Sequence, residues 1–527
     1  MKDGLGRIKE FLLVTGALVL LYLLHFWPYL GSFSTDLFYF QDLTDIRTVS
    51  WNTWHFRQRL VAGSNPFFSE HILHPHGTSM YMHGTTPFFG LLNLLFNNVA
   101  VSINTGIGIL LVSMGVGYYY LSRKWLQPLG AFLVAVTAVF NTYFLDKAGI
   151  HLNLMLMSCV PFLILLFLNS VTIEDGRITA FNRSAFMGFV ILLFAQILFD
   201  HYAIFYTLSF CIVYIVYHLY LHQLKDWSYK KKGVLILGLL AVGHVASRLL
   251  RISGVDERGA IWAAADIRSL FTPSVNNRFY SDLVIEGLPH TLNDNKMFLG
   301  FGLMIVLMLA LIQFIAKAKN RNGNRFLFFV MCVYFLVCLP VIKYDGKNLF
   351  YSITGLIHYI PFVNNVRAPD RFVVMLFWLV PLFSFRVLET AEVWKKVNKY
   401  LLAVLFLVLS FADHKMNTMQ AEAQLVKKHP LMVESDANAY FIIPFGIRDG
   451  YKHIGDYDTY HVMLQQVHQK PMTSGYISRI HKDIWQSADS NALFNLIIRL
   501  QEGKESSVEE VDLHAELSKL EVSHILA

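Results

Sequence analysis

Apolar stretches recur along the chain at lengths close to those a helix needs to cross a bilayer. About 20 consecutive apolar residues, each rising about 1.5 Å along a helix, cover the hydrocarbon core of a membrane. Such stretches lie at residues 11–29, 99–121, 126–144, 152–168, 185–199, 202–221, 233–250, 297–315, 326–342, 372–387 and 400–411. The pattern predicts a mainly α-helical, polytopic membrane protein with about eleven transmembrane helices.

Basic residues occur in every second connection between these stretches, for example at Arg123 and Lys124, at 230–232 and at Lys395 and Lys396. Cytoplasmic loops retain Lys and Arg during insertion. With eleven spans, the N-terminus is therefore expected in the cytoplasm and the C-terminus outside. The net charge of +7 is then mainly an insertion signal. Because these charges form no continuous stripe, nucleic-acid binding is not expected.

Hydropathy falls after about residue 413, where alternating stretches such as AYFIIPFG and a charged amphipathic tail begin. Strands are predicted near 440–443 and 524–526, and helices near 484–503 and 508–520. The sequence therefore predicts two domains, a transmembrane domain of residues 1–412 and a small extracytoplasmic α/β domain of residues 413–527.

The connection between the first two apolar stretches, residues 31–98, is long and rich in reactive side chains. It carries the carboxylates of Asp36, Asp42 and Asp45, the rings of Trp51 and Trp54, the run GSNPFF with Asn65, the run HPHG, and His83. A short loop suffices to turn a chain at a membrane surface. A long one with carboxylates, imidazoles and aromatic rings indicates a functional site at the interface.

Two side-chain types in this outer loop have both a chemical and a structural interpretation. Asp45, or Asp42, could act as a general base toward an acceptor, or could cap a helix next to the membrane. His83 could shuttle protons or, with His71, His74 and His76, bind a transition metal, whereas HPHG is also typical of a proline-fixed turn.

Further polar residues lie at the outer ends of predicted spans. His151 opens the fourth span, and Asp200 and His201 occupy a very short outer turn, where they are candidates for substrate binding or are simply wetted by the interface. Arg367 and Arg371 flank Pro369 and could grip a phosphate, or could reach lipid headgroups. Asp266 and Lys296 are weaker candidates.

Several common catalytic motifs are missing from the sequence. It contains no phosphate-binding P-loop, no dinucleotide fingerprint, no GxSxG and no HExxH. An ATP-driven pump and a zinc protease of the usual type are therefore disfavoured.

Asp45 with Trp51 and Trp54, GSNPFF, HPHG with His83, His151 with Asn153, the run RAPDR and the later run GYISR together resemble bacterial polytopic proteins of the GT-C glycosyltransferase superfamily. The resemblance covers most of the chain and is carried by the order of these motifs. In that superfamily an acidic residue of the first outer loop acts as base or binds a metal, and Asp45 matches it best by position, with Asp42 second. Arginines at outer span ends hold the donor phosphate, which suggests Arg367 and Arg371.

The resemblance implies an inverting hexosyl- or pentosyltransferase of the cell envelope. Its donor would be a polyprenyl-phosphate-linked sugar, and its acceptor a glycan, lipid or protein on the outer face of the bilayer. A divalent cation is the one cofactor it suggests, and the loop here lacks the adjacent acidic pair of better-studied branches. Two other hypotheses remain, a transporter or flippase of a lipid-linked glycan and a non-catalytic scaffold of the same fold.

Overall fold

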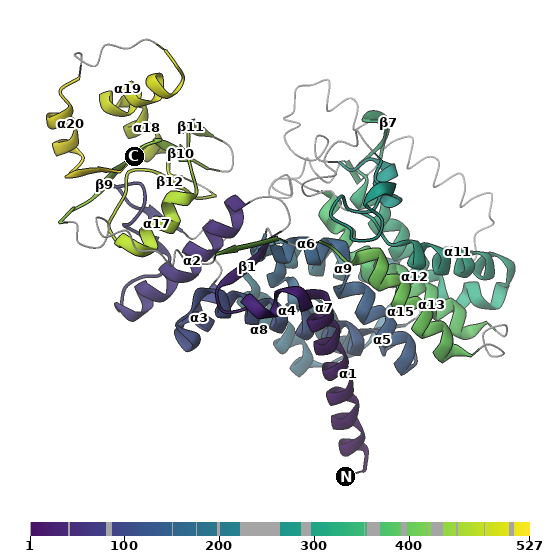
Figure 1. Ribbon diagram of the computed structural model, residues 1–527. Helices are drawn as coiled ribbons and strands as arrows, with labels where there is room; N and C mark the ends of the chain where they lie inside the picture. The colour runs from purple at the N-terminus through teal and green to yellow at the C-terminus, as the bar shows by residue number, and fades with distance from the viewer. Residues whose placement is uncertain are drawn as a thin grey trace. The chain divides into compact units, whose positions relative to one another are not determined.

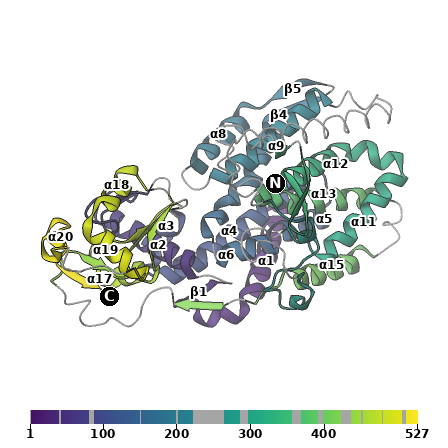
Figure 2. The ribbon, with the colours of Figure 1, turned by 90° about the horizontal axis from the view of Figure 1, so that it is seen from above.

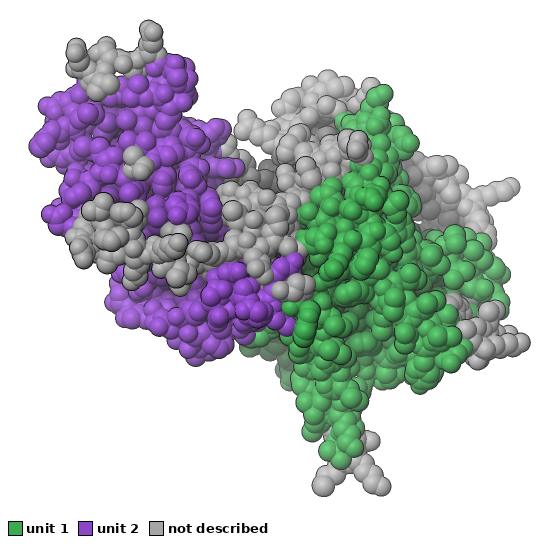
Figure 3. Space-filling model, in the orientation of Figure 1, with its two compact units in different colours: residues 1–27, 108–147, 154–418 green, residues 28–107, 148–153, 419–527 purple. Residues whose placement is uncertain are grey.

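The computed structural model describes residues 2–39, 43–80, 87–149, 151–174, 176–197, 201–221, 264–285, 297–352, 354–355, 369–391, 398–417, 419–422, 436–449, 452–478, 480–504 and 511–526. The chain forms two compact units (Figure 3). Unit 1 comprises residues 1–27, 108–147 and 154–418, and unit 2 comprises residues 28–107, 148–153 and 419–527.

Unit 1 is built mainly from apolar helices, as predicted. They are α1 (Lys2–Phe26), the greater part of α4 (Val99–Ser122), α5 (Pro128–Val139), α6 (Thr142–Gly149), α7 (Val160–Ser170), α8 (Arg183–Ile197), α9 (His201–Leu219), α11 (Phe301–Ala316), α12 (Ala318–Cys338), α13 (Val373–Thr390) and α15 (Lys399–His414). Each of these helices overlaps one of the apolar stretches predicted from the sequence. The stretch at 233–250 lies outside the described residues.

Four of the described helices are long and apolar enough to cross a membrane, or five if the bent pair α5 and α6 forms one span. The protein is thus a multi-pass membrane protein, and the count of eleven spans remains a prediction. Two predicted spans are interrupted in the structure. The third bends by 42° between α5 and α6, and the fourth begins as the 3-10 helix η2 (Leu152–Cys159) before α7.

The centre of unit 1 is α13, which packs against α5, α11 and α12 (Figure 2). Its residues from Val373 to Ser384 are all buried. The indole N–H of Trp378 donates to Ser122 Oγ at 3.2 Å, which ties α13 to the end of α4. Since 83% of this span is buried within the protein, α13 is a core helix with little surface left for lipid.

Two hairpins connect helices of unit 1. One pairs β4 (Val171–Glu174) with β5 (Arg177–Phe181), and the other pairs β6 (Val341–Tyr344) with β7 (Lys347–Tyr351). The second turns through Asp345 and Gly346, whose φ angles are +53° and +70°. Two consecutive positive φ angles define a type I′ turn, for which Asp-Gly is a preferred sequence.

Unit 2 combines helices with short strands. From the first outer loop come β1 (Asp36–Tyr39), α2 (Leu43–Val61), the β2 (Phe68–Ser69) and β3 (Thr78–Ser79) hairpin, and α3 (Pro87–Phe96). From the C-terminal region come β8 (Met419–Glu422), β9 (Tyr440–Ile442), β10 (Gly446–Arg448), β11 (His453–Gly455), α17 (Tyr460–His468), β12 (Gly475–Tyr476), α18 (Lys482–Ser490), α19 (Ala492–Gln501), α20 (Leu513–Lys519) and β13 (His524–Leu526). The two strands predicted near 440–443 and 524–526 pair in parallel as β9 and β13.

The first outer loop and the C-terminal region fold together in unit 2. Strand β1 pairs antiparallel with β8, and α2 packs against α17 (Figure 1). The backbone N–H of His74 donates to the carbonyl of Met472 at 3.0 Å. The division predicted at residue 413 follows hydropathy along the chain, whereas the compact units follow packing in space.

In unit 1, the buried carboxylate of Asp413, at the end of α15, caps a different helix. It accepts the backbone N–H of Gly302 at 2.8 Å and also that of Phe301, both in the first turn of α11. The N-cap residue of α11 is Gly300, which has a φ of +91° and cannot supply a side-chain cap. A Cβ atom at Gly300 would lie 2.9 Å from Asp413 Oδ2. Glycine there both allows the turn and makes room for the cap.

The two residues after Asp413 also satisfy helix ends. His414 Nδ1 accepts the backbone N–H of Thr142 at 3.2 Å, at the start of α6. The ammonium of Lys415 donates to the carbonyl of His25, in the last turn of α1. An acceptor at a helix start and a cation at a helix end both satisfy unpaired backbone groups and complement the helix dipole. Three consecutive residues therefore fix three helices of unit 1.

Replacing Asp413 with Ala is expected to destabilise unit 1 by about 1–3 kcal/mol, because two buried N–H groups lose their acceptor. Thermal unfolding in detergent should show a lower Tm than in wild type. Asp282→Ala, which removes an exposed carboxylate of the same unit, is the control and should leave the Tm unchanged. Equal Tm values for the two variants would refute the capping role.

Candidate functional site

The acidic and histidine candidates of the first outer loop are only partly described. Helix α2 begins at Leu43, which places Asp45 in its first turn. Asp42 and His83 lie outside the described residues, as do Asp200 and Arg367.

The two tryptophans of this loop lie in the interior of unit 2. Trp51 is 1% exposed, and its indole N–H donates to Gln465 Oε1 of α17 at 2.5 Å. Trp54 is also buried, and its ring meets His71 edge-on at 6.0 Å between centroids. The structure therefore packs both rings between α2 and its neighbours, and their contact with a substrate remains a prediction.

Asn65 shapes an exposed turn that follows α2. Its side-chain Oδ1 accepts the backbone N–H of Phe67 at 2.9 Å, and its carbonyl accepts from Arg59 Nε at 3.4 Å. Asparagine commonly holds a turn in this way.

Histidines gather between α2, the segment after it and α17. The ring of His55 stacks on Trp51 at 4.9 Å, and His71 meets His55 edge-on at 5.7 Å. His461 and His468 of α17 lie within electrostatic range of one another, and His71 is within range of His468. Burial is the main cause that lowers the pKa of His71 and His461, and it lowers the pKa of His468 to about 4.

From this histidine cluster we predict that unit 2 is less stable at acidic pH. A pKa near 4 lies below the ordinary 6.5, so below pH 6.5 the unfolded chain binds more protons than the folded one. His468 alone should then reduce stability by about 2 kcal/mol between pH 7 and pH 5. Thermal unfolding of the full chain at those two pH values tests it.

His468→Asn is the matched variant, because its amide oxygen can still accept the N–H of Lys470, which His468 Nδ1 accepts at 3.0 Å. We expect this variant to lose part of the acid sensitivity. The opposite sign, greater stability at pH 5 than at pH 7, would contradict neutral, buried imidazoles.

The structure places the HPHG segment against the C-terminal region. His76 Nε2 lies 2.9 Å from Ser487 Oγ of α18, on the surface of unit 2. Within the described part of the chain, no group of three or more His, Cys, Asp or Glu side chains is arranged to hold a metal ion. Metal binding by a set that includes His83 or Asp42 remains a prediction.

Two other candidates mark the starts of helical segments. His151 is partly buried and precedes η2, and His201 is the first residue of α9.

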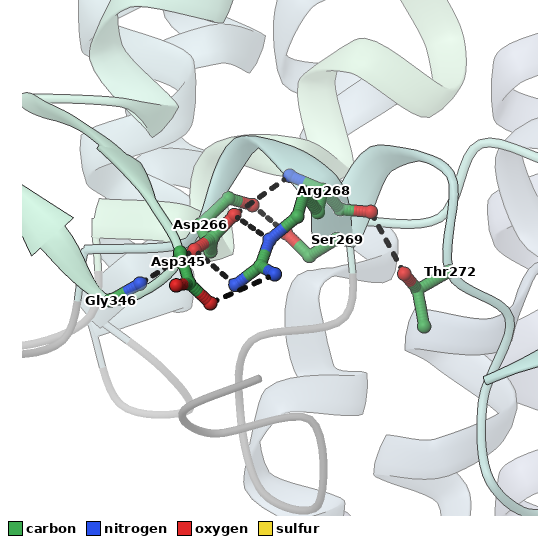
Figure 4. A network of polar contacts seen from close by, with 6 residues as sticks. All are labelled: Asp266, Arg268, Ser269, Thr272, Asp345 and Gly346. Atoms are coloured by element: carbon green, nitrogen blue, oxygen red, sulfur yellow. Dashed lines mark hydrogen bonds and ion pairs between the residues drawn. The ribbon is translucent and has the colours of Figure 1, made fainter. Parts of the chain in front are cut away.

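Asp266 lies in a network of unit 1 that joins residues 264–285 to the β6–β7 hairpin. Its carboxylate accepts Arg268 Nε at 3.0 Å, Arg268 Nη2 at 3.1 Å and the N–H of Gly346 at 3.0 Å. Figure 4 shows Arg268 between Asp266 and Asp345, the latter at 3.2 Å. Burial alone would raise the pKa of Asp266, but the bonds from Arg268 and Gly346 outweigh it and lower that pKa. This carboxylate is occupied in holding the hairpin.

The same hairpin carries a buried lysine that the sequence patterns did not single out. Lys343 of β6 is 7% exposed, and its backbone pairs in parallel with that of Asp266 as an isolated β-bridge. It lies within electrostatic range of Asp266 and of the buried Asp370. Burial is the larger influence and lowers the pKa of Lys343 despite the attraction of these carboxylates. The Asp-Gly turn next to it was the available sequence signal.

Arg371 follows Asp370 in η8 (Pro369–Phe372), directly before α13. Its guanidinium carbon lies 5.0 Å from the centroid of the Tyr202 ring of α9. An arginine that serves only lipid headgroups belongs on a lipid-facing helix. Arg371 instead begins the most buried candidate span among the described residues, so its position favours a role inside the protein.

A second charged pair missed by the sequence patterns lies just after the bend between α5 and α6. Lys147 Nζ is 3.4 Å from Asp146 Oδ2, and each side chain is 1% exposed. Lys147 also lies 5.6 Å from the centroid of the Tyr143 ring. Charges buried in a membrane protein usually serve a function. In the sequence, Asp146 and Lys147 could have been noticed as an ionisable pair that begins two residues after the predicted span 126–144.

Comparison with solved structures finds an arabinofuranosyltransferase and archaeal oligosaccharyltransferases, all at low sequence identity. The arabinofuranosyltransferase AftD from Mycobacteria is 13% identical with a TM-score of 0.46, over 89% of this chain and 32% of that one. The apo oligosaccharyltransferase from Archaeoglobus fulgidus is 10% identical with a TM-score of 0.43, over 88% and 64%. The oligosaccharyltransferase AglB from the same organism, in complex with an inhibitory peptide and a dolichol-phosphate, is 11% identical with a TM-score of 0.40, over 89% and 65%.

The likeness is remote, and the chain spans about a third of the length of the arabinofuranosyltransferase. Comparison of the sequence with curated proteins gives no significant match. Residues 13–415, more than half of the chain, match the model of a family described as Domain of unknown function (DUF6311). The chain therefore belongs to the DUF6311 family.

Proposed function

We propose that this protein is an inverting membrane glycosyltransferase. It takes a sugar from a polyprenyl-phosphate donor and transfers it to a glycan, lipid or protein acceptor on the extracytoplasmic face of a bacterial inner membrane. The observation that best supports the proposal is the position of Arg371, directly before α13 and over the ring of Tyr202. A guanidinium that stacks on Tyr202 at the start of the core helix α13 is suited to bind an anionic group carried by a lipid.

A lipid-borne donor requires a protein that meets both the hydrocarbon phase and a polar reacting group. The apolar helices of unit 1 provide the first. The charged residues at the start of α13 and on the β6–β7 hairpin provide polar groups next to them, with Lys343 and Arg371 as the cations. Preorganised cations stabilise a phosphate leaving group most strongly when water is excluded.

The reaction needs one base and one stabilised leaving group. The acceptor hydroxyl oxygen forms a bond to the anomeric carbon as the bond from that carbon to the phosphate oxygen breaks. Asp45 takes the hydroxyl proton, and polyprenyl phosphate leaves with the bonding electron pair. Arg371, with Arg367, neutralises the phosphate. Because the acceptor attacks opposite the leaving group, the anomeric configuration inverts.

Transfer of labelled sugar tests the proposal. The purified full chain, reconstituted in proteoliposomes, is given a panel of undecaprenyl-phosphate pentoses and hexoses together with bacterial envelope glycans. We expect a labelled product from one donor, with the opposite anomeric configuration by NMR. Retention of configuration would overturn the inverting mechanism, and absence of transfer from every donor would overturn the enzymatic proposal.

The same assay decides whether Asp45 acts as base or metal ligand. If a divalent cation takes part, chelation should abolish transfer and added Mg²⁺ or Mn²⁺ should restore it. If Asp45 is simply the base, transfer should be insensitive to chelator.

A further inference from the structure

Helix α3, in the first outer loop, has one face packed and one face open. On the packed face, the Phe56 ring of α2 fills the space beside Gly90, where a Cβ would lie 2.5 Å from its Cδ1. The ring of Phe89 lies against Gly106 of α4 in the same way, at 2.6 Å. Asn93 accepts from Ser102 Oγ of α4 at 3.2 Å. The helix is therefore held firmly between α2 and α4.

The open face of α3 is wholly apolar. Leu91, Leu94, Leu95 and Phe96 are 48%, 39%, 77% and 43% exposed. Positions 91, 94 and 95 are spaced as one stripe of a helix. The whole helix, PFFGLLNLLF, contains no charged residue. Soluble proteins seldom expose a contiguous group of large apolar side chains unless a partner covers it.

The position of α3 in the chain identifies the partner. Only Asn97 and Asn98 separate it from α4, which is long and apolar enough to cross the membrane. Asn98 caps α4 by accepting the N–H of Val101 at 2.9 Å, so the membrane span starts directly after it. The C-terminal end of α3 must then lie close to the boundary of the hydrocarbon core.

The length of α3 excludes a second crossing. Ten residues make a helix of about 15 Å, half of the roughly 30 Å that a span must cover. An apolar helix of this length next to a span fits the interfacial zone, where its apolar face can lie about 5–10 Å below the headgroups.

We propose that α3 is an interfacial helix that anchors unit 2 to the outer leaflet of the bilayer through Leu91, Leu94, Leu95 and Phe96. The phospholipid surface is its partner, bound by apolar contact and not by charge. The anchor holds the N-terminal half of the first outer loop, including α2, at a fixed height above the lipid, because Phe56 and Gly90 lock α2 to α3.

Site-specific fluorescence tests this proposal in the full chain. The four native cysteines are replaced by alanine, and Leu95→Cys carries an environment-sensitive NBD label. Ser64→Cys, in the exposed turn of the same loop, is the matched control. Each protein is placed singly in a nanodisc of phosphatidylethanolamine and phosphatidylglycerol. Both positions are partly or wholly exposed, so labelling leaves the packed face of α3 intact.

We expect the label at position 95 to emit at shorter wavelength and to be quenched several-fold more by doxyl-labelled lipid than by aqueous iodide. The label at position 64 should show the reverse. Stronger quenching by iodide at position 95 would overturn the proposal. So would a label that becomes shielded only when two copies share one nanodisc, because a second chain would then cover the face.

Discussion

Replacing Asp45 with Asn should abolish sugar transfer while the protein still inserts and folds. The amide has nearly the same shape as the carboxylate but cannot take a proton from the acceptor. General-base catalysis contributes about 10²–10⁴-fold, so kcat should fall by at least about 100-fold. The KM for the donor should change little, because Asp45 does not contact the phosphate in the proposed reaction.

Asp36→Asn is the matched control for this substitution. It makes the same change in the same outer loop. Asp36 lies in strand β1, and its backbone carbonyl accepts a hydrogen bond from the Asn104 side chain. Transfer should persist in this variant. If Asp45→Asn retained full turnover, Asp45 would have no part in the reaction, and Asp42 would be the next residue to replace.

Replacing Arg371 with Ala should lower kcat/KM for the donor by about 10²-fold, since a single oriented donor to a developing anion is typically worth that much or more. Polyprenyl phosphate, the product, should also inhibit the variant less strongly than it inhibits wild type. Weakened product inhibition is a readout that a purely structural role of Arg371 would not produce. Inhibition curves at several phosphate-lipid concentrations measure it.

Arg371→Lys and Arg177→Ala complete the series. Lysine keeps the charge but loses the planar fork and the stacking on Tyr202, so its effect should be intermediate. Arg177, an exposed residue of β5, should be replaceable without loss. An Arg371→Ala variant that inserts poorly yet binds polyprenyl phosphate normally would favour the alternative of a headgroup contact.

The hydrophobic pattern along the sequence was sufficient to predict those helices and strands in which consecutive residues are buried. The stretch at 372–387 predicted α13, and 440–443 and 524–526 predicted β9 and β13. It was less informative for α2, a helix of 19 residues in a connection where a helix was considered only as the structural alternative for Asp42 or Asp45. One partner of α2 is α17, some 400 residues further along, and the bond from Trp51 to Gln465 leaves no trace in local sequence.

The candidate residues show the same limit. The bond from Arg268 to Asp266 is local and foreseeable, whereas the bond from Gly346 to Asp266 joins residues 80 positions apart. Asp413 lies two residues beyond a predicted span, and nothing near it indicates that it caps α11. By contrast, the Asp-Gly turn of the β6–β7 hairpin is a local signal that would have drawn attention to Lys343.

The fate of the donor in a single turnover tests the central claim most directly. Purified protein in proteoliposomes is mixed with the polyprenyl-phosphate sugar that it accepts, together with acceptor, and the lipids are analysed by mass spectrometry. We predict that sugar-free polyprenyl phosphate appears in a one-to-one ratio with glycosylated acceptor. Recovery of intact donor that has moved to the opposite leaflet would contradict a transferase and identify a flippase.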